Sequence, residues 1–119
     1  MQSDDSLVNT ISAINRFTSE RDWEQFHTVK NLVASITIEA AELSETVQWI
    51  SPTTDEILQN KELVQRISHE LADVMVYCLN LCSKLDFDPV KIIQEKIIHN
   101  AEKYPVEKSF GNSKKYSEH

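Results

Sequence analysis

Glycine and proline are scarce in this sequence of 119 residues, which contains one glycine, Gly111, and three prolines. A fold rich in β-sheet needs more turn glycine than that. The glycine-rich phosphate loops of the Walker and Rossmann types need several glycines at fixed spacing, so both are excluded. Any chemistry on nucleotides must therefore come from side chains and a metal ion.

Cysteines and long apolar runs are also scarce. Cys78 and Cys82 are four residues apart, and no histidine or further cysteine completes a zinc site, so we expect reduced thiols in or near the core. No apolar run approaches the roughly 20 residues of a membrane span, and no signal peptide is evident, which favours a cytoplasmic protein without a membrane partner. The net charge of -7 argues against sequence-independent binding to nucleic acid.

The apolar periodicity predicts an all-α fold, formed as a single domain over residues 1–119. In the third predicted helix the apolar residues cover a wide arc, which indicates burial on two sides and hence a homo-oligomer. We expect a short helical turn capped by Thr54 or Asp55 before that helix, and N-caps at Thr28 and Asp88 for the second and fourth helices. The four main helices are predicted over about residues 5–19, 28–49, 62–85 and 89–104, with an irregular tail over 106–119.

Four acidic residues interrupt the apolar stripes of two predicted helices. Glu39 and Glu42 lie in TIEAAELSE with i, i+3 spacing, so both project from one side of a helix. Glu70 and Asp73 have the same spacing in HELADVMVY. A carboxylate inside an apolar stripe is costly unless its charge is compensated, and four facing acids also repel one another. A divalent cation removes both problems, so the pattern predicts a metal site that handles a phosphorylated substrate.

The predicted metal is a hard ion. No histidine stands in ExxH spacing with these acids, which disfavours a di-iron centre and favours Mg²⁺, with Mn²⁺ as a substitute. No serine or cysteine has a neighbouring base, so water activated at the metal is the expected nucleophile. The alternative is that the acids lie at the edges of the stripes and pair with lysines, in which case they are structural.

Basic residues gather toward the C-terminus. Residues 1–90 carry 6 basic and 15 acidic side chains, whereas residues 91–119 carry 6 basic and 4 acidic ones. A polyanionic ligand could therefore be held between a metal on the acidic part and lysines on the last part. Lys96 and Asn100 are spaced i, i+4 and suit phosphate oxygens as a point charge and an amide donor. The alternative is a solvated helix face, with Lys103 favoured near the helix C-terminus by the dipole.

Aromatic residues flank the second predicted helix. Trp23, His27 and Trp49 could contact or stack on a base, and such stacking is worth about 1–3 kcal/mol per base. For any single one of them, closing the end of the helical bundle is the more common role. Tyr77 is four residues after Asp73 and shares its face, so it could orient that carboxylate, contact a sugar or simply pack.

Together these motifs resemble those of a known family. EAAE at 39–42 followed by ELAD at 70–73 resembles the ExxE…ExxD signature of the MazG-like, all-alpha nucleoside triphosphate pyrophosphohydrolases. RDWEQFHTVKNL at 21–32 and KIIHNAEKYPV at 96–106 are similar to the dCTP pyrophosphatase branch of that family. The resemblance extends over residues 17–104, nearly the whole chain.

The resemblance implies a four-helix fold that assembles as a dimer or a dimer of dimers, and Mg²⁺-dependent cleavage between the α and β phosphates. Val29 stands where the family often has proline, which affects the shape of the loop beside it. The implied metal ligands are Glu39, Glu42, Glu70 and Asp73. The implied phosphate-binding residues are Lys96 and Asn100, with Lys103 and Tyr104 nearby. The implied base and sugar pocket consists of Trp23, His27, Lys30, Asn31 and Trp49, partly across a subunit boundary.

These inferences lead to one hypothesis and two alternatives. The hypothesis is a Mg²⁺-dependent pyrophosphatase for dCTP or a modified dCTP, which removes unwanted nucleotides. Glu39 and Glu42 are the expected catalytic residues, with Glu42 taking the proton of the attacking water. A related enzyme for another nucleotide, such as dUTP or a phosphoribosyl nucleotide, is the first alternative. The second is a helical oligomerisation module without catalysis, whose melting temperature Mg²⁺ and nucleotide would leave unchanged.

Overall fold

The structure, a computed structural model, describes residues 3–114, and this described part is helical without any strand. It thereby confirms the all-α class that the scarcity of glycine predicts. Among the described helices, none combines the length and hydrophobicity needed to cross a membrane. In chain order the elements are α1 (Ser3–Glu20), the 3-10 helix η1 (Glu24–Phe26), α2 (Val29–Glu45), α3 (Thr54–Leu58), α4 (Lys61–Leu85), α5 (Pro89–Lys103) and α6 (Val106–Ser109).

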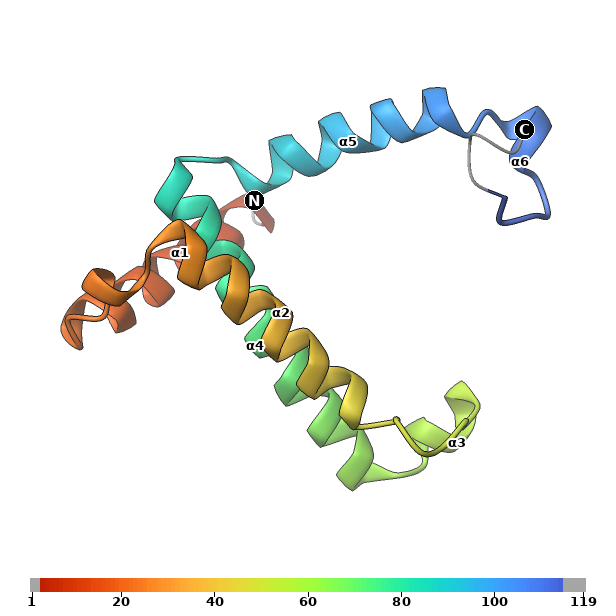
Figure 1. The fold of residues 1–119 in the computed structure, drawn as a ribbon, viewed down its shortest axis with the longest axis horizontal. Coiled ribbons are helices and arrows are strands. Elements are labelled where there is room, and N and C mark those ends of the chain that lie inside the picture. The colour runs from red at the N-terminus through yellow and green to blue at the C-terminus, as the bar shows by residue number, and fades with distance from the viewer. Residues whose placement is uncertain (1–2, 115–119) are drawn as a thin grey trace. The chain divides into compact units, whose positions relative to one another are not determined.

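The chain divides into two compact units, Met1–Leu85 and Asp86–His119. Within the first unit, α2 and α4 lie side by side and run antiparallel (Figure 1). The α1 and α3 helices also pack on α4. This antiparallel pairing of the two acid-bearing helices positions the candidate site. The described part of the second unit contains α5 and α6.

Side-chain caps determine where two of the long helices begin. Thr28 is the N-cap of α2, as predicted, and its hydroxyl accepts a hydrogen bond from the backbone N–H of Asn31 at 3.1 Å. Asp88 is the N-cap of α5, as predicted, and its carboxylate accepts from the N–H of Val90 at 3.0 Å. Pro89 occupies the first helical position, where its missing N–H costs nothing.

The second helix is shorter than the sequence pattern predicts, because α2 ends at Glu45 and not at Trp49. From Thr46 onward the backbone hydrogen bonds reach back three residues instead of four, which tightens the chain into turns. The Thr46 hydroxyl also donates to the Leu43 carbonyl at 2.7 Å, a bond that competes with the helical pattern. Trp49 consequently lies in the turn region beyond the helix.

The cap of the short helix α3 differs from the prediction as well. Thr53 is the N-cap, not Thr54 or Asp55. Its hydroxyl accepts from the N–H of Glu56 at 3.2 Å, and the Glu56 carboxylate accepts from the N–H of Thr53 at 2.8 Å. This reciprocal capping box satisfies two free backbone donors, which explains why the helix begins one residue earlier.

The tail predicted to be irregular over residues 106–119 contains a short helix, α6, at residues 106–109. The helix starts directly after Pro105, whose backbone is extended and whose carbonyl accepts from the N–H of Ser109 at 3.0 Å. The prediction for residues 115–119 lies outside the described residues.

The described core is small and lies mainly between α2 and α4. Leu32 is 1% exposed and Leu63 is 6% exposed. Leu71 and Met75 on α4 are exposed by contrast, because α2 covers only part of the wide apolar arc of that helix. Neither cysteine forms a disulfide within the described residues, as expected of reduced thiols. The prediction of a position in or near the core is wrong for Cys78, which is exposed.

Candidate functional site

Three of the four predicted acids meet where α2 and α4 pack together. Glu39 projects from α2, and Glu70 and Asp73 project from α4. One carboxylate oxygen of each lies within 4.8 Å of the others, a spacing that allows all three to hold one metal ion. Because α2 and α4 pack side by side, Glu39 on one helix comes close to the i, i+3 pair Glu70 and Asp73 on the other.

The surroundings of Glu39 and Glu70 raise the pKa values of both. Burial, followed by a hydrogen bond to Glu42 and the charges of Glu42, Asp73 and Glu70, raises the pKa of Glu39 to about 7. Burial and the neighbouring carboxyl of Glu42 likewise raise the pKa of Glu70, while nearby His69 opposes the shift. Glu42 therefore lies close enough to interact with acids on both helices, although its own side chain is exposed. Such mutual repulsion is what a bound cation would relieve.

The cluster also contains an oxygen that lacks a partner. Oε2 of Glu70 is buried, and no described residue forms a hydrogen bond with it. Within residues 3–85, the ion pair formed is Arg21 with Glu20 at 3.9 Å, and none of the four acids pairs with a lysine or arginine. The first unit therefore does not support the alternative that the acids have a structural role in ion pairs with lysines. An oxygen-only donor set with unsatisfied charge fits a hard divalent cation.

A cavity of about 470 Å³ adjoins the acid cluster, and Asp73 belongs to both. Its walls are mostly apolar and aromatic, with a few polar groups, which is the usual composition of a small-molecule site. It is formed by α1, the segment around η1 and the second half of α4. The lining residues are Thr10, Ala13, Ile14, Phe17, Thr18, Trp23, His27, Asp73, Val76, Tyr77 and Asn80.

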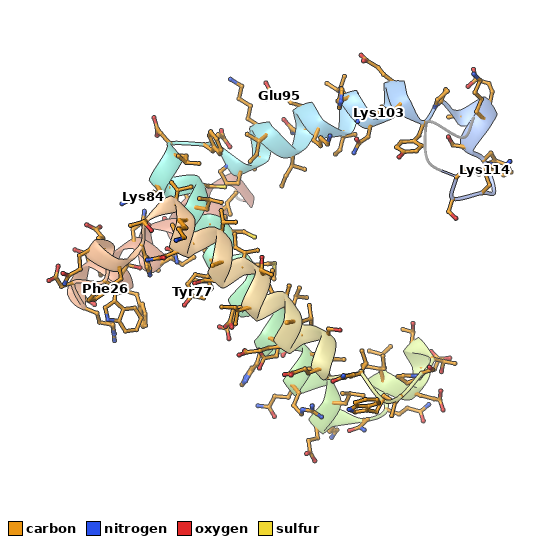
Figure 2. The ribbon with its side chains drawn as sticks, in the orientation of Figure 1. Phe26, Tyr77, Lys84, Glu95, Lys103 and Lys114 are labelled. Carbon is orange, nitrogen blue, oxygen red and sulfur yellow. The ribbon has the colours of Figure 1, made fainter. Side chains whose placement is uncertain are left out.

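Aromatic rings form two edge-to-face pairs in the cavity wall. The rings of Phe17 and Trp23 have centroids 5.6 Å apart at an angle of 77°. Those of His27 and Tyr77 are 6.3 Å apart at 65°, so Tyr77 reaches from α4 toward the segment that contains η1 (Figure 2). The guanidinium of Arg21 covers the Phe17 ring at 3.8 Å. The three predicted residues Trp23, His27 and Tyr77 thus line one cavity.

The predicted residues Lys30 and Asn31 lie at the start of α2, outside the cavity wall. The side-chain amide of Asn31 donates to the Phe26 carbonyl at 2.9 Å, and its backbone N–H donates to Thr28. Asn31 therefore joins η1 to the first turn of α2. Val29, which stands where the family often has proline, is the first residue of α2 and directly follows the N-cap Thr28.

Five predicted residues lie elsewhere. Trp49 is 86% exposed and does not line the cavity, because α2 ends before it. The other four, Lys96, Asn100, Lys103 and Tyr104, belong to α5 and its C-cap in the second unit.

Sequence reasoning missed two buried polar residues of the cavity, Thr18 and Asn80. They are 6% and 8% exposed, and both also line a neighbouring, more polar cavity of about 350 Å³. A signal for Asn80 was present: it is an amide between Leu79 and Leu81 in an apolar helix, seven residues after Asp73 and hence on the same face.

Paired acids on two antiparallel helices beside an aromatic cavity define an all-helical protein with a candidate divalent-cation site. The chain belongs to the MazG-like family, whose model matches residues 34–118. This match confirms the family that the ExxE…ExxD motifs resemble.

Similar proteins include the dCTP pyrophosphatase 1 of Rattus norvegicus, 36% identical over 104 residues, and that of Homo sapiens, 32% identical over 112 residues. Each alignment covers 86% of this chain but 61% of the relative, so the chain spans less than two thirds of the relatives' length. The crystal structure of a pyrophosphatase from Archaeoglobus fulgidus DSM 4304 is also similar, with a TM-score of 0.75 and 34% identity. That match covers 84% of this chain and 93% of the other.

Proposed function

We propose that this protein is a Mg²⁺-dependent nucleoside triphosphate pyrophosphohydrolase with dCTP, or a modified dCTP, as its substrate. The observation that carries the proposal is the position of Asp73, which belongs both to the carboxylate cluster and to the aromatic cavity. A triphosphate attracts divalent cations, and a nucleoside suits an apolar cavity. Because Asp73 belongs to both, the candidate cation site and the apolar cavity are neighbours, as a nucleoside triphosphate requires.

The carboxylate cluster is the proposed metal site. Glu39, Glu70 and Asp73 would hold the cation, with Glu42 close to two of them. The unpartnered Oε2 of Glu70 and the raised pKa of Glu39 are both features of carboxylates that a bound cation would stabilise. When bound, Mg²⁺ would neutralise phosphate charge and polarise the α-phosphorus. Mn²⁺ has similar ligand preferences and is the natural substitute.

The proposed reaction is hydrolysis of the bond between the α and β phosphates. Water attacks the α-phosphorus, the bond to the bridging oxygen breaks, and the products are a nucleoside monophosphate and pyrophosphate. Glu42 is the proposed acceptor of the water proton, because it is exposed and lies beside Glu39 and Glu70. Glu39, the most strongly shifted acid, would assist as a ligand near the attacked atom. Consumption of unwanted dNTPs would be the cellular role.

The aromatic cavity is the proposed nucleoside site. Trp23 and His27 offer rings for stacking on the base. Tyr77 contacts His27 and follows Asp73 by about one turn of α4, so it would contact the sugar. The relatives named dCTP pyrophosphatase 1 support cytosine as the base. The family motif supports phosphate contacts from Lys96, Asn100, Lys103 and Tyr104, and further substrate contacts from Lys30, Asn31 and Trp49.

Self-association is part of the proposal, as a dimer or a dimer of dimers. Val33 and Ile38 on α2 are 49% and 58% exposed, and Leu71 and Met75 on α4 are 42% and 52% exposed. Apolar side chains exposed in such number on packed helices are typical of surfaces that a partner covers. Light scattering coupled to size-exclusion chromatography tests this directly, and the mass of a single chain would contradict it.

The test of the activity is incubation of the purified protein with Mg²⁺ and a panel of dCTP, 5-methyl-dCTP, dUTP, dTTP, dATP and a phosphoribosyl nucleotide. We expect pyrophosphate and monophosphate from dCTP, and no turnover once a chelator removes the metal. Release of orthophosphate would contradict the proposed bond. Turnover of another nucleotide in place of dCTP would contradict the substrate. Absence of any turnover, together with a melting temperature that nucleotide and Mg²⁺ do not raise, would favour a module without catalysis.

A further inference from the structure

Asn80 is a buried amide without a described partner. Its side chain is 8% exposed, and none of the side-chain hydrogen bonds formed by the described residues involves it. Buried Thr46, by comparison, donates to a backbone carbonyl at 2.7 Å. A carboxamide carries two donor hydrogens and an acceptor oxygen. The polar atoms of Asn80 are not among the fully enclosed ones, so a molecule in the cavities that Asn80 lines can reach them. Because Asn80 lines the nucleoside cavity, a ligand in that cavity can supply the missing partners.

The position of Asn80 on α4 matches the length of a nucleotide. Asp73, Tyr77 and Asn80 are spaced i, i+4 and i+7, so they follow one face of the helix, and all three line the cavity. Seven residues at 1.5 Å per residue separate Asp73 from Asn80 by about 10 Å along the axis. With the α-phosphate at Asp73 and the sugar beside Tyr77, the edge of a pyrimidine ring comes to Asn80.

We propose that Asn80 reads the hydrogen-bonding edge of the substrate's base and so determines which base the enzyme accepts. This inference rests on the function proposed above. Oδ1 of Asn80 accepts from the 4-amino group of cytosine, and Nδ2 donates to the ring nitrogen N3. Apolar neighbours such as Ile14 and Val76 line the same cavity and help to exclude the water that would otherwise compete. Asn80 is a specificity residue in this scheme and takes no part in bond cleavage.

The experiment is a double cycle that removes each partner of the hydrogen bond in turn. The wild-type protein and Asn80→Leu, an apolar replacement of similar size, are each assayed with dCTP. Both are also assayed with the triphosphate of the deoxynucleoside of pyrimidin-2-one, which lacks only the 4-amino group. For wild type we expect kcat/KM to fall roughly 10-fold when the amino group is removed, as for the loss of a good base contact. For Asn80→Leu the two substrates should be hydrolysed at nearly equal, reduced rates.

Two further variants separate base reading from a structural role. Ser83→Ala, one turn further along α4, lines only the neighbouring cavity and should keep the wild-type preference for the amino group. Asn80→Ala repeats the cycle with a smaller side chain, and thermal unfolding checks that each variant is folded. If Asn80 variants lose activity equally on both substrates and keep the full preference, the inference is overturned. Equal rates of the wild type on both substrates overturn it as well.

Failure of this inference is distinguishable from failure of the proposed function. A wild type that hydrolyses dCTP, beside an Asn80→Leu variant with unchanged preference, overturns only the role of Asn80. A wild type that hydrolyses no nucleotide overturns the proposed function. In that case the same cycle is measured by calorimetric binding of dCMP and its analogue without the amino group, and equal affinities overturn base reading. A preference for dUTP that Asn80→Leu abolishes would overturn the assignment to cytosine.

Discussion

The acid cluster and the aromatic cavity share Asp73 on α4, yet they differ in almost every physical property. The cluster consists of like charges, and burial together with the neighbouring acids raises the pKa values of Glu39 and Glu70. The cavity is lined largely by rings and aliphatic side chains, and by the buried amide of Asn80, seven residues after Asp73 on α4. The difference suggests a division of labour along one helix: the cluster handles charge on the phosphates, and the cavity selects the nucleoside. Substitutions in the two regions should therefore affect different kinetic constants.

Removal of a cluster acid is expected to have the largest effect. Asp73→Asn and Glu70→Gln keep the shape of the side chain but remove a metal-binding charge, so kcat should fall by roughly 1,000-fold or more, as for other groups that stabilise transition-state charge. Metal-free thermal stability should stay the same or rise, because repulsion among the acids is relieved. Steady-state kinetics and melting curves without metal measure the two effects.

Glu45→Gln is the matched control for the acids. Glu45 is exposed on the last turn of α2 and lies outside the cluster, so its loss should leave both kcat and metal-free stability near wild type. If Asp73→Asn unfolds the protein, or if Glu45→Gln lowers kcat as much, the cluster is not a distinct metal site.

Replacement of an aromatic residue of the cavity is expected to act mainly on substrate binding. Trp23→Ala removes a ring from the cavity wall, and KM for dCTP should rise roughly 5- to 100-fold, the range that corresponds to one stacked base. The metal dependence of the reaction should not change, because Trp23 lies outside the carboxylate cluster.

Phe26→Ala controls for the loss of an aromatic ring in the same segment. Phe26 lies in η1, is 60% exposed and does not line the cavity, so KM should remain close to wild type. Because Trp23 also packs against Phe17, Trp23→Phe should recover part of the affinity and the stability. Equal effects of Trp23→Ala and Phe26→Ala on KM would remove the assignment of the cavity to the nucleoside.

The difference between the acid cluster and the cavity also explains which features could be predicted from the sequence. The acids of α2 and α4 were predictable because i, i+3 spacing fixes the face of a helix, and a short connection favours antiparallel pairing. Asn80 could not be predicted as a site residue, because a single amide among apolar residues indicates a site only once its burial and its lack of hydrogen-bond partners are known. The end of α2 depended on a local competition for hydrogen bonds at Thr46, which apolar periodicity does not reveal. The exposure of Trp49 follows from that same early end.

The smallest expected effect concerns pH, and it should appear only on the cluster side of the comparison. Burial, together with the neighbouring acids, raises the pKa of Glu39 from an ordinary 4.5 to about 7. Between these values the folded protein binds a proton that the unfolded chain has already lost, so metal-free stability should fall as pH rises from about 4.5 to 7 and then level off. Mg²⁺ competes with that proton, so the increase in melting temperature on adding Mg²⁺ should grow over the same pH range.

Melting curves at several pH values, with and without Mg²⁺, measure both trends. Glu39→Gln should flatten the metal-free trend, whereas Trp23→Ala should leave it unchanged. A metal-free stability that rises across this range, or a slope that survives Glu39→Gln, would mean that Glu39 is not the group that gains the proton on folding.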